Sequence, residues 1–465
     1  MPAPQIIWFR NDLRLADQAA VRAAARAGPV VALYVLDDHR PAPDSAPEGW
    51  RQGWAMGAAQ RWWLHHSLAS LAKDLKALGG CLVLRRGRSA EVVPAVAAEV
   101  GAGAVHCLGR VEPWARADEA AVAARVRLHV HDGVALVRPE SVLTGTGGRY
   151  RIFTPWWRRM LEQMSPGQPW GAPEAIDFVG DVASDRLEDW GLLPMRPNWA
   201  KGFDVWTPGE AGAAARLADF VGRASAYDRT RNLPSVEGTS RLSPHLAMGE
   251  ISVRTVWRAV EGAVGEAGEP FLRELGWRDF AANILDLFPD HGEVPGRAVF
   301  ERFGFLEDSE ALAAWQQGRT GYPVVDAGMR QLWGEGWMHN RVRMIAASFL
   351  TKHLLIDWRH GERWFWDCLV DADLAANSLG WQWVMGSGVD SSPFNRVFAP
   401  VGQSAKFEAA DYIRRWVPEL RSLDDKAIHA PWEHGGVRCY PPPIVGHEAA
   451  RARALDAFGV ARAGV

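Results

Sequence analysis

Two acidic side chains, an amide and two indoles stand close together in residues 371–383, DADLAANSLGWQW. If this stretch is helical, Asp373, Asn377 and Trp381 recur at every fourth residue and share one face. Such a face offers hydrogen-bond acceptors, an amide and a flat ring to a single ligand. Trp383 follows Trp381 by two residues, so its ring points elsewhere. The alternative interpretation is a capped helix end that packs into a core.

A second polar stretch, WMHNRVRM at residues 337–344, precedes an apolar run. On a helix, Asn340 and Arg343 share one face, and Arg341 and Met344 form a second pair. Cationic side chains in an apolar helix need a counter-charge or a polyanion. One arginine could pair with an aspartate of residues 371–383, and the other could face phosphate.

Two further stretches carry polar groups next to helical patterns. Residues 237–249, EGTSRLSPHLAMG, gather hydroxyl groups and one arginine before a helix start. This pattern is typical of an anion site or of a capping loop. Residues 271–280, FLRELGWRDF, group Glu274, Trp277 and Arg278. Glu274 and Arg278 lie four residues apart, and a surface salt bridge is the simpler explanation.

The elements that must position these residues fall into two classes. Near the N-terminus, continuous apolar runs alternate with helical patterns, which predicts a parallel sheet covered on both faces and a doubly wound α/β domain. The predicted strands are residues 5–9, 30–36, 81–85, 104–109 and 127–131, and the predicted helices are 17–27, 54–78, 90–100 and 115–126. No Gly-rich phosphate fingerprint is present. A ligand could still lie at the carboxyl ends of the strands, near residues 8–14 and 110–116, which could equally be salt-bridged sheet termini.

Strand patterns disappear after the first domain. Residues 133–205 are rich in Gly, Pro and Trp and are typical of a long connector. Helical periodicity returns at 209–222, 252–264, 269–288, 309–317, 323–335, 339–356, 361–370 and 372–380. We therefore predict an α/β domain at 1–132, a connector at 133–205 and an all-helical domain at 206–465.

Composition limits the remaining classes of protein. A net charge of −3 neither requires nor excludes a polyanionic partner, so a nucleic-acid surface would be a local basic patch. The four cysteines form no CxxC pair, and we expect no metal site. The N-terminus reaches charged residues within its first ten positions, and no apolar run is long enough to span a bilayer. We expect a cytoplasmic protein with no membrane partner.

Taken together and in order, these stretches resemble the photolyase/cryptochrome family from residue 5 to about 445. The motifs that carry the resemblance are WFRNDLRL, YDRTRNLP, GTSRLSPHLAMGEIS, ELGWRDF, GYPVVDAGMRQL, GWMHNRVRM, DWRHGER, DADLAANSLGWQW and FNRVFAPVGQSAKFEAADYIRRWVPEL. Within the family the chain is most similar to class I cyclobutane pyrimidine dimer photolyases. The resemblance implies a monomer.

The resemblance implies that the helical domain binds FAD. The residues that it assigns to the cofactor are Tyr227, Thr239, Ser240, Arg241, Leu242, Ser243, Arg278, Asn340, Arg343, Asp371, Ala372, Asp373 and Asn377. Arg343 and Asp371 would pair beside the isoalloxazine ring, and Asn377 would face flavin N5. Plant cryptochromes carry aspartate at that last position, so Asn377 favours repair.

The resemblance also implies a light-driven reaction on UV-damaged DNA, in which excited reduced FAD donates an electron to a dimer flipped out of the helix. The catalytic residues that it implies are Glu274, Trp277, Asn340, Met344 and Trp383. Arg231, Arg341 and Gln403 would contact the DNA backbone. Glu274 would hydrogen-bond to the thymine edge, and Trp277 and Trp383 would form flat apolar walls.

Two accessory features are less regular. Trp381 and Trp358 match the first two positions of a three-tryptophan photoreduction relay, but the third position is Phe305. Trp364 or Trp366 could supply the exit instead. The N-terminal domain would hold an antenna, either a deazaflavin or methenyltetrahydrofolate, or an empty pocket; RVEPWAR at residues 110–116 is more similar to the deazaflavin type.

Three alternatives compete with dimer repair. A cryptochrome photoreceptor without repair activity is the main rival, but the chain lacks a long tail after RRWVPEL and carries Asn377. Enzymes for 6-4 photoproducts use a different His-centred pocket, and WMHNRVRM argues against that class. A nucleotide-binding α/β protein with a helical appendage would explain the first domain alone.

Overall fold

The computed structural model describes residues 2–164 and 166–463, and the chain divides into two compact units. The first unit comprises residues 1–199, 204–225 and 240–290, and the second comprises residues 200–203, 226–239 and 291–465. Each unit is built from several separate segments of the chain, whereas the predicted domains 1–132, 133–205 and 206–465 are consecutive ranges. The predicted limits therefore stay a prediction. None of the described helices combines the length and hydropathy needed to cross a membrane.

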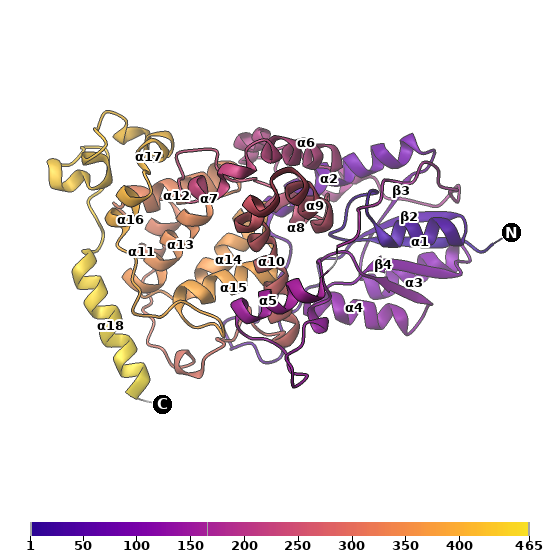
Figure 1. The fold of residues 1–465 in the computed structure, drawn as a ribbon, viewed down its shortest axis with the longest axis horizontal. Coiled ribbons are helices and arrows are strands. Elements are labelled where there is room, and N and C mark those ends of the chain that lie inside the picture. Colours follow the sequence, from indigo (N-terminus) through magenta and orange to yellow (C-terminus); the bar gives the residue numbers. More distant parts are fainter. Residues whose placement is uncertain (1, 165, 464–465) are drawn as a thin grey trace. The chain divides into compact units, whose positions relative to one another are not determined.

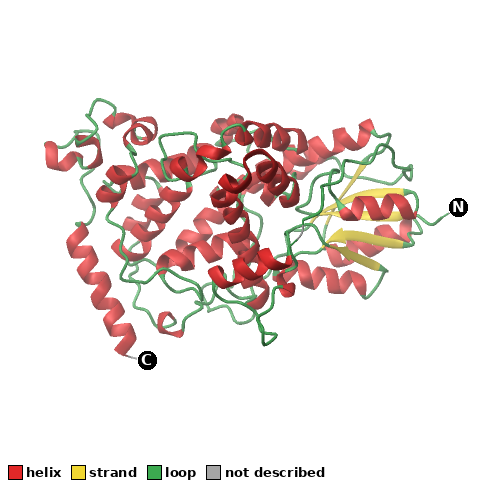
Figure 2. Cartoon of the chain, in the orientation of Figure 1, coloured by secondary structure: helices red, strands yellow, loops and turns green. Residues whose placement is uncertain are grey.

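The first unit contains a sheet of parallel strands (Figures 1 and 2). The strand order is β3-β2-β1-β4-β5. Its strands are β1 (Gln5–Phe9), β2 (Val30–Leu36), β3 (Leu82–Arg86), β4 (Ala104–Leu108) and β5 (Leu128–His131). Every residue of β1, β2 and β4 is buried, as expected for strands covered on both faces. The predicted doubly wound α/β fold is therefore confirmed.

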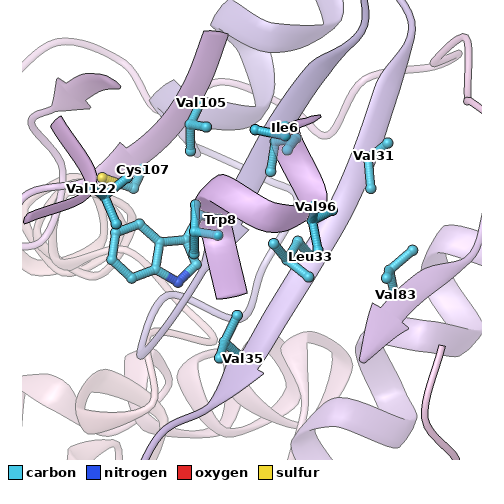
Figure 3. Packing of buried hydrophobic residues seen from close by; sticks show 12 residues of the cluster. Ile6, Trp8, Val31, Leu33, Val35, Val83, Val96, Val105, Cys107 and Val122 are labelled. Carbon is cyan, nitrogen blue, oxygen red and sulfur yellow. The ribbon is translucent and has the colours of Figure 1, made fainter. Parts of the chain in front are cut away.

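The helices of this sheet are α1 (Ala19–Ala27), α2 (Ala58–Ala77), α3 (Ser89–Glu99) and α4 (Pro113–Ala123). On one face of the sheet, Ile6 and Trp8 of β1 and Leu33 of β2 form a buried cluster with Val96 of α3 and Val122 of α4 (Figure 3). This packing holds the strands in register and brings their carboxyl ends to one edge.

Five further helices belong to the first unit: α5 (Phe153–Gln163), α6 (Glu210–Val221), α8 (Ser243–Ala247), α9 (Val253–Val264) and α10 (Glu269–Leu287). The sequence did not predict α5, which lies inside the Gly- and Pro-rich segment 133–205. Its buried side chains are Phe153, Trp156, Trp157 and Met160, so three large rings stabilise a helix that composition alone does not indicate.

The described residues of the second unit form helices joined by loops and contain no strand, as predicted. Its helices are α7 (Tyr227–Thr230), α11 (Ser309–Gln316), α12 (Pro323–Glu335), α13 (Asn340–Ser348), α14 (Trp358–Cys368), α15 (Leu374–Met385), α16 (Pro400–Lys406), α17 (Ala410–Trp416) and α18 (His447–Ala463). A π-helical turn, Phe349–His353, continues α13. The helix predicted at 372–380 is wrong at both ends: α15 begins only after Asp373, the N-cap, and ends at Gly386, whose φ is 92°.

One buried carboxylate joins several elements of the first unit. Glu250 accepts hydrogen bonds from Trp63 Nε1 of α2 at 2.9 Å, from Ser67 Oγ at 2.5 Å and from the Gly209 backbone N–H at 2.7 Å. Its second oxygen lies 2.5 Å from Nδ1 of His245 in α8. Because Glu250 has no solvent exposure, these partners replace the water that the carboxylate has lost.

We predict that Glu250→Ala lowers the free energy of unfolding by about 3–5 kcal/mol, since it leaves several buried donors without an acceptor. Urea unfolding followed by circular dichroism measures the change. Glu266→Ala, at an exposed position of the same unit, should change the free energy by less than about 0.5 kcal/mol. Equal effects of the two substitutions would contradict the role given to Glu250.

Candidate functional site

The centre of the polar interior of the second unit is an ion pair between α13 and the residues before α15. Arg343 donates from Nη2 to Asp371 Oδ2 at 2.8 Å and from Nε to the Met338 carbonyl at 2.8 Å. The Asp371 side chain is 2% exposed. Its other oxygen, Oδ1, is buried and accepts no hydrogen bond from the described residues. The structure therefore contains the predicted arginine–aspartate pair, with one acceptor left for a further donor.

A second buried carboxyl lies next to Asn377. Glu362 of α14 is fully buried, and its Oε1 accepts from Ser378 Oγ at 2.5 Å. Burial raises the pKa of Glu362 well above its usual range, while the hydrogen bond from Ser378 opposes the shift. The Asn377 amide nitrogen donates to the Glu362 backbone carbonyl at 2.9 Å. This contact uses the amide nitrogen, so the side-chain oxygen of Asn377 is the group of that amide that can accept a further hydrogen bond.

Sequence reasoning missed Glu362. The available signal was an acidic residue in WRHGERWFWDC, a helix that carries five aromatic rings if His360 is included. Because α14 and α15 are adjacent along the chain and pack together, an acid buried on one is expected to meet a polar residue of the other.

Of the shared face predicted for Asp373, Asn377 and Trp381, the last two lie four residues apart on α15 and both contact α14, whereas Asp373 is the N-cap of that helix. The Asp373 carboxylate caps α15 by accepting from the Ala376 N–H at 2.8 Å. Trp381 is 2% exposed and packs against Phe365 at 4.9 Å and Trp315 at 6.1 Å between ring centroids.

The relay residues lie in different surroundings. Trp358 is 1% exposed, and Phe305 contacts the Phe303 ring at 4.9 Å. Of the two alternative exits, Trp364 stacks on Trp333 at 6.1 Å with an interplanar angle of 7°. Trp333 is 55% exposed, so this pair leads to solvent. Which ring ends the relay stays a prediction.

The residues expected to meet DNA occupy the surface of the second unit. Asn340 is exposed and Met344 is half-buried at the start of α13. The Arg341 guanidinium donates to Asn232 Oδ1 at 2.7 Å and lies 4.5 Å from the centre of the Phe407 ring. Such contacts hold a long cationic side chain in one orientation, as a phosphate contact requires.

Three further expected contacts also lie in the second unit. The Arg231 guanidinium lies over the Tyr227 ring at 5.2 Å. Gln403 of α16 and Trp383 of α15 are half-buried. Each of these side chains therefore keeps part of its surface available to a ligand.

Other expected site residues belong to the first unit. On α10, Glu274 and Trp277 are half-buried. Arg278 donates to the Val134 carbonyl at 2.9 Å and lies 3.3 Å from Asp279. Burial raises the pKa of Asp279 to about 6, although the Arg278 charge opposes this shift.

The hydroxyl-rich loop spans the limit between the two units, since Thr239 belongs to the second unit and Ser240–Ser243 to the first. Arg241 has a left-handed backbone conformation with φ of 52°, which is uncommon for a residue other than glycine. Its guanidinium lies over the Trp206 ring at 5.4 Å. The Ser240 hydroxyl accepts from the Leu242 N–H at 3.3 Å, so part of this loop is locally ordered.

The carboxyl ends of the strands carry salt bridges, one of the two alternatives for residues 8–14 and 110–116. Arg10 pairs with Glu119 at 2.8 Å. Arg110 donates from Nε to Glu112 at 3.1 Å. Burial opposes ionisation of Glu112, but the charge and hydrogen bond of Arg110, a backbone hydrogen bond and the Arg10 charge together outweigh it and lower the pKa of Glu112 to about 2. This edge is strongly charged, and a ligand there would have to compete with these pairs.

The polar groups of the second unit suit a flavin. A reduced flavin ring presents N–H donors, and a buried carboxylate oxygen without a donor is costly. Asp371 Oδ1 is such an oxygen. The side-chain carbonyl of Asn377 is a second acceptor, on an amide whose nitrogen donates to the Glu362 backbone carbonyl. The residues present therefore fit the group.

Comparison with known proteins identifies the family. Residues 271–460 match the FAD binding domain of DNA photolyase, and residues 5–174 match the DNA photolyase family. A deoxyribodipyrimidine photo-lyase of Agrobacterium fabrum is 43% identical over 99% of this chain and 98% of that protein. The chain belongs to the DNA photolyase family. Cryptochrome-1 of Arabidopsis thaliana is also similar, with 36% identity over 97% of this chain and 70% of that protein.

The photolyase structures refine the comparison. A bacterial class III photolyase from Agrobacterium tumefaciens superposes with a TM-score of 0.92 and 43% identity over 99% of this chain and 98% of its own. The sequence prediction placed the chain closest to class I, and this similarity to a class III photolyase corrects that part of it. The family assignment and the FAD-binding domain are as predicted.

We predict that Glu362→Gln removes a pH dependence of stability. Because the folded pKa lies above the unfolded value, the wild-type carboxyl is protonated in both states below about pH 4.3, and stability falls as the pH rises from there towards the folded pKa. The amide cannot ionise, so the stability of the variant relative to that of the wild type should increase as the pH rises. Thermal unfolding between pH 5 and pH 9 tests this, and parallel pH profiles of the two proteins would contradict it.

Proposed function

We propose that this protein repairs cyclobutane pyrimidine dimers in UV-damaged DNA in a light-dependent reaction, as a class III photolyase. The observation that carries the proposal is the buried Asp371 oxygen without a donor, together with the held amide of Asn377, within a sequence that matches the FAD binding domain of DNA photolyase. The 43% identity to a deoxyribodipyrimidine photo-lyase over nearly the whole chain supports the choice of reaction.

When bound in its reduced form and excited by light, FAD supplies one electron to the dimer and takes it back after the ring has split, so that the cycle consumes no reductant. The protein would orient the cofactor. Asp371 Oδ1 would accept from a ring N–H, while Arg343 neutralises the carboxylate charge. Asn377 would accept at N5, because its nitrogen is already bound to the Glu362 carbonyl.

The remaining cofactor contacts that we propose are Tyr227, Thr239, Ser240, Arg241, Leu242, Ser243, Arg278, Asn340, Ala372 and Asp373. The hydroxyl-rich loop before α8 offers O–H and N–H donors, which suit a diphosphate. A deazaflavin or methenyltetrahydrofolate antenna in the N-terminal domain would complete the chromophores.

The substrate side would use Glu274, Trp277, Asn340, Met344 and Trp383. A dimer pairs and stacks poorly, so its extrusion costs less than that of normal bases. The two indoles would stack on it, and Glu274 would hydrogen-bond to the thymine edge and stabilise its radical anion. Arg231, Arg341 and Gln403 would contact the backbone, and the affinity should fall with salt.

The rival function, a photoreceptor without repair activity, is favoured by the similarity to cryptochrome-1. One assay separates the two. The reduced protein is illuminated with oligothymidylate that contains dimers, and absorbance near the thymine band is followed. Recovery of that absorbance supports repair, and a flavin-containing protein without recovery supports the photoreceptor. We also expect a monomer in the cytoplasm, which light scattering and cell fractionation would test.

We predict that Glu274→Ala lowers the repair yield several-fold while FAD remains bound, because the carboxyl would contact the substrate and not the cofactor. Flavin absorbance per protein measures binding, and thymine recovery per absorbed photon measures repair. Glu269→Ala provides the control, since this α10 residue has a side chain that is 53% exposed and pairs only weakly, at 3.9 Å, with Arg273. Parallel loss of flavin and repair in Glu274→Ala would show that the residue is misplaced.

A further inference from the structure

Helix α5 is closely fitted to α10, the helix that carries Glu274 and Trp277. Gly276 of α10 faces the Trp157 ring of α5, and a Cβ atom at that position would overlap this ring. The absence of a side chain therefore permits the close approach of the two helices. Both helices belong to the first unit, so the contact lies inside one compact body.

The first residue of α5, Phe153, covers one face of the Trp277 indole. The two ring centroids are 3.7 Å apart, and the ring planes differ by 9°. Phe280 meets both rings edge-on, at 5.6 Å from Phe153 and 5.8 Å from Trp277. The Arg273 guanidinium lies 5.2 Å from the Phe153 ring centre. Trp277 is thus held against a flat ring on one side and an edge on another.

The two stacked rings differ in exposure. Phe153 is 1% exposed, whereas Trp277 is half-buried. Because Phe153 occupies one face of the indole, a flat ligand could stack only on the opposite face. A tryptophan that can rotate must lose that freedom when a base stacks on it, and a ring already held in place loses less.

We propose that Phe153 is a positioning residue for damaged DNA: it fixes the plane of Trp277 so that one indole face is presented to the extruded pyrimidine dimer. This inference rests on the proposed repair function and adds to it a residue outside the helical segment expected to contain the site. It predicts that Phe153 increases the affinity for DNA with an extruded dimer and not for undamaged DNA, whose bases would not reach the indole face.

The test compares Phe153→Leu with Phe153→Tyr. Leucine keeps apolar volume but removes the flat ring, and tyrosine keeps the ring. Binding of a dimer-containing single strand should weaken about 3- to 10-fold in the leucine variant. Binding of the undamaged strand, flavin content, and repair yield at saturating substrate should stay within about twofold. The tyrosine variant should bind as the wild type does. Phe9→Leu, in the buried strand β1, controls for general loss of a core ring.

Three outcomes would overturn the proposal: unchanged dimer affinity in Phe153→Leu, equal weakening for damaged and undamaged strands, or the same loss in Phe9→Leu. Phe153→Met serves as a second variant if the leucine protein does not fold, and the same expectations apply to it. If the wild type itself shows no preference for the dimer, the proposed function fails first, and this inference fails with it. Weaker binding of the dimer-containing strand alone in Phe153→Leu, with wild-type binding in Phe153→Tyr, would support the proposal.

Discussion

A carboxylate that has left water needs a counter-charge, and Asp371 finds one in Arg343. The pair joins α13 to the segment before α15, and it costs free energy unless both groups are fully hydrogen-bonded. Arg343 satisfies one oxygen of Asp371 and the Met338 carbonyl, but Asp371 Oδ1 remains without a donor among the described residues. The polar interior is therefore incomplete as protein alone, which is the physical reason to expect a ligand with N–H groups there.

The backbone around Asp371 is fixed from both sides. The Val370 N–H donates to the carbonyl of Gly336, which ends α12 with a left-handed φ of 67°. On the other side, Asp373, two residues after Asp371, caps α15. The carboxylate thus sits between two helix termini, and its position depends on the cap geometry more than on helical periodicity.

The many tryptophans serve two physical uses that composition cannot separate. Trp381 is enclosed by Trp315 and Phe365, as core residues are. Trp277 has one ring face covered and part of its surface exposed, which is the condition for stacking a base. Only the placement of neighbouring rings distinguishes a packed indole from a binding surface.

The sequence by itself determined what depends on local pattern. The strands of the parallel sheet were predicted within one residue at each end. For β1, β2 and β4 the reason is that strands buried on both faces read as continuous apolar runs bounded by turns. The need of a buried cation for an anion predicted a pair between an arginine of residues 337–344 and an aspartate of residues 371–383, and the family resemblance named Arg343 and Asp371. Long motifs identified the family, although they pointed to class I where the solved structures favour class III. Tertiary structure alone decided that Asp373 is a cap, that Glu362 is buried behind Asn377, and that α5 forms within a Gly- and Pro-rich segment. Each of these depends on contacts between residues whose partners no local period specifies.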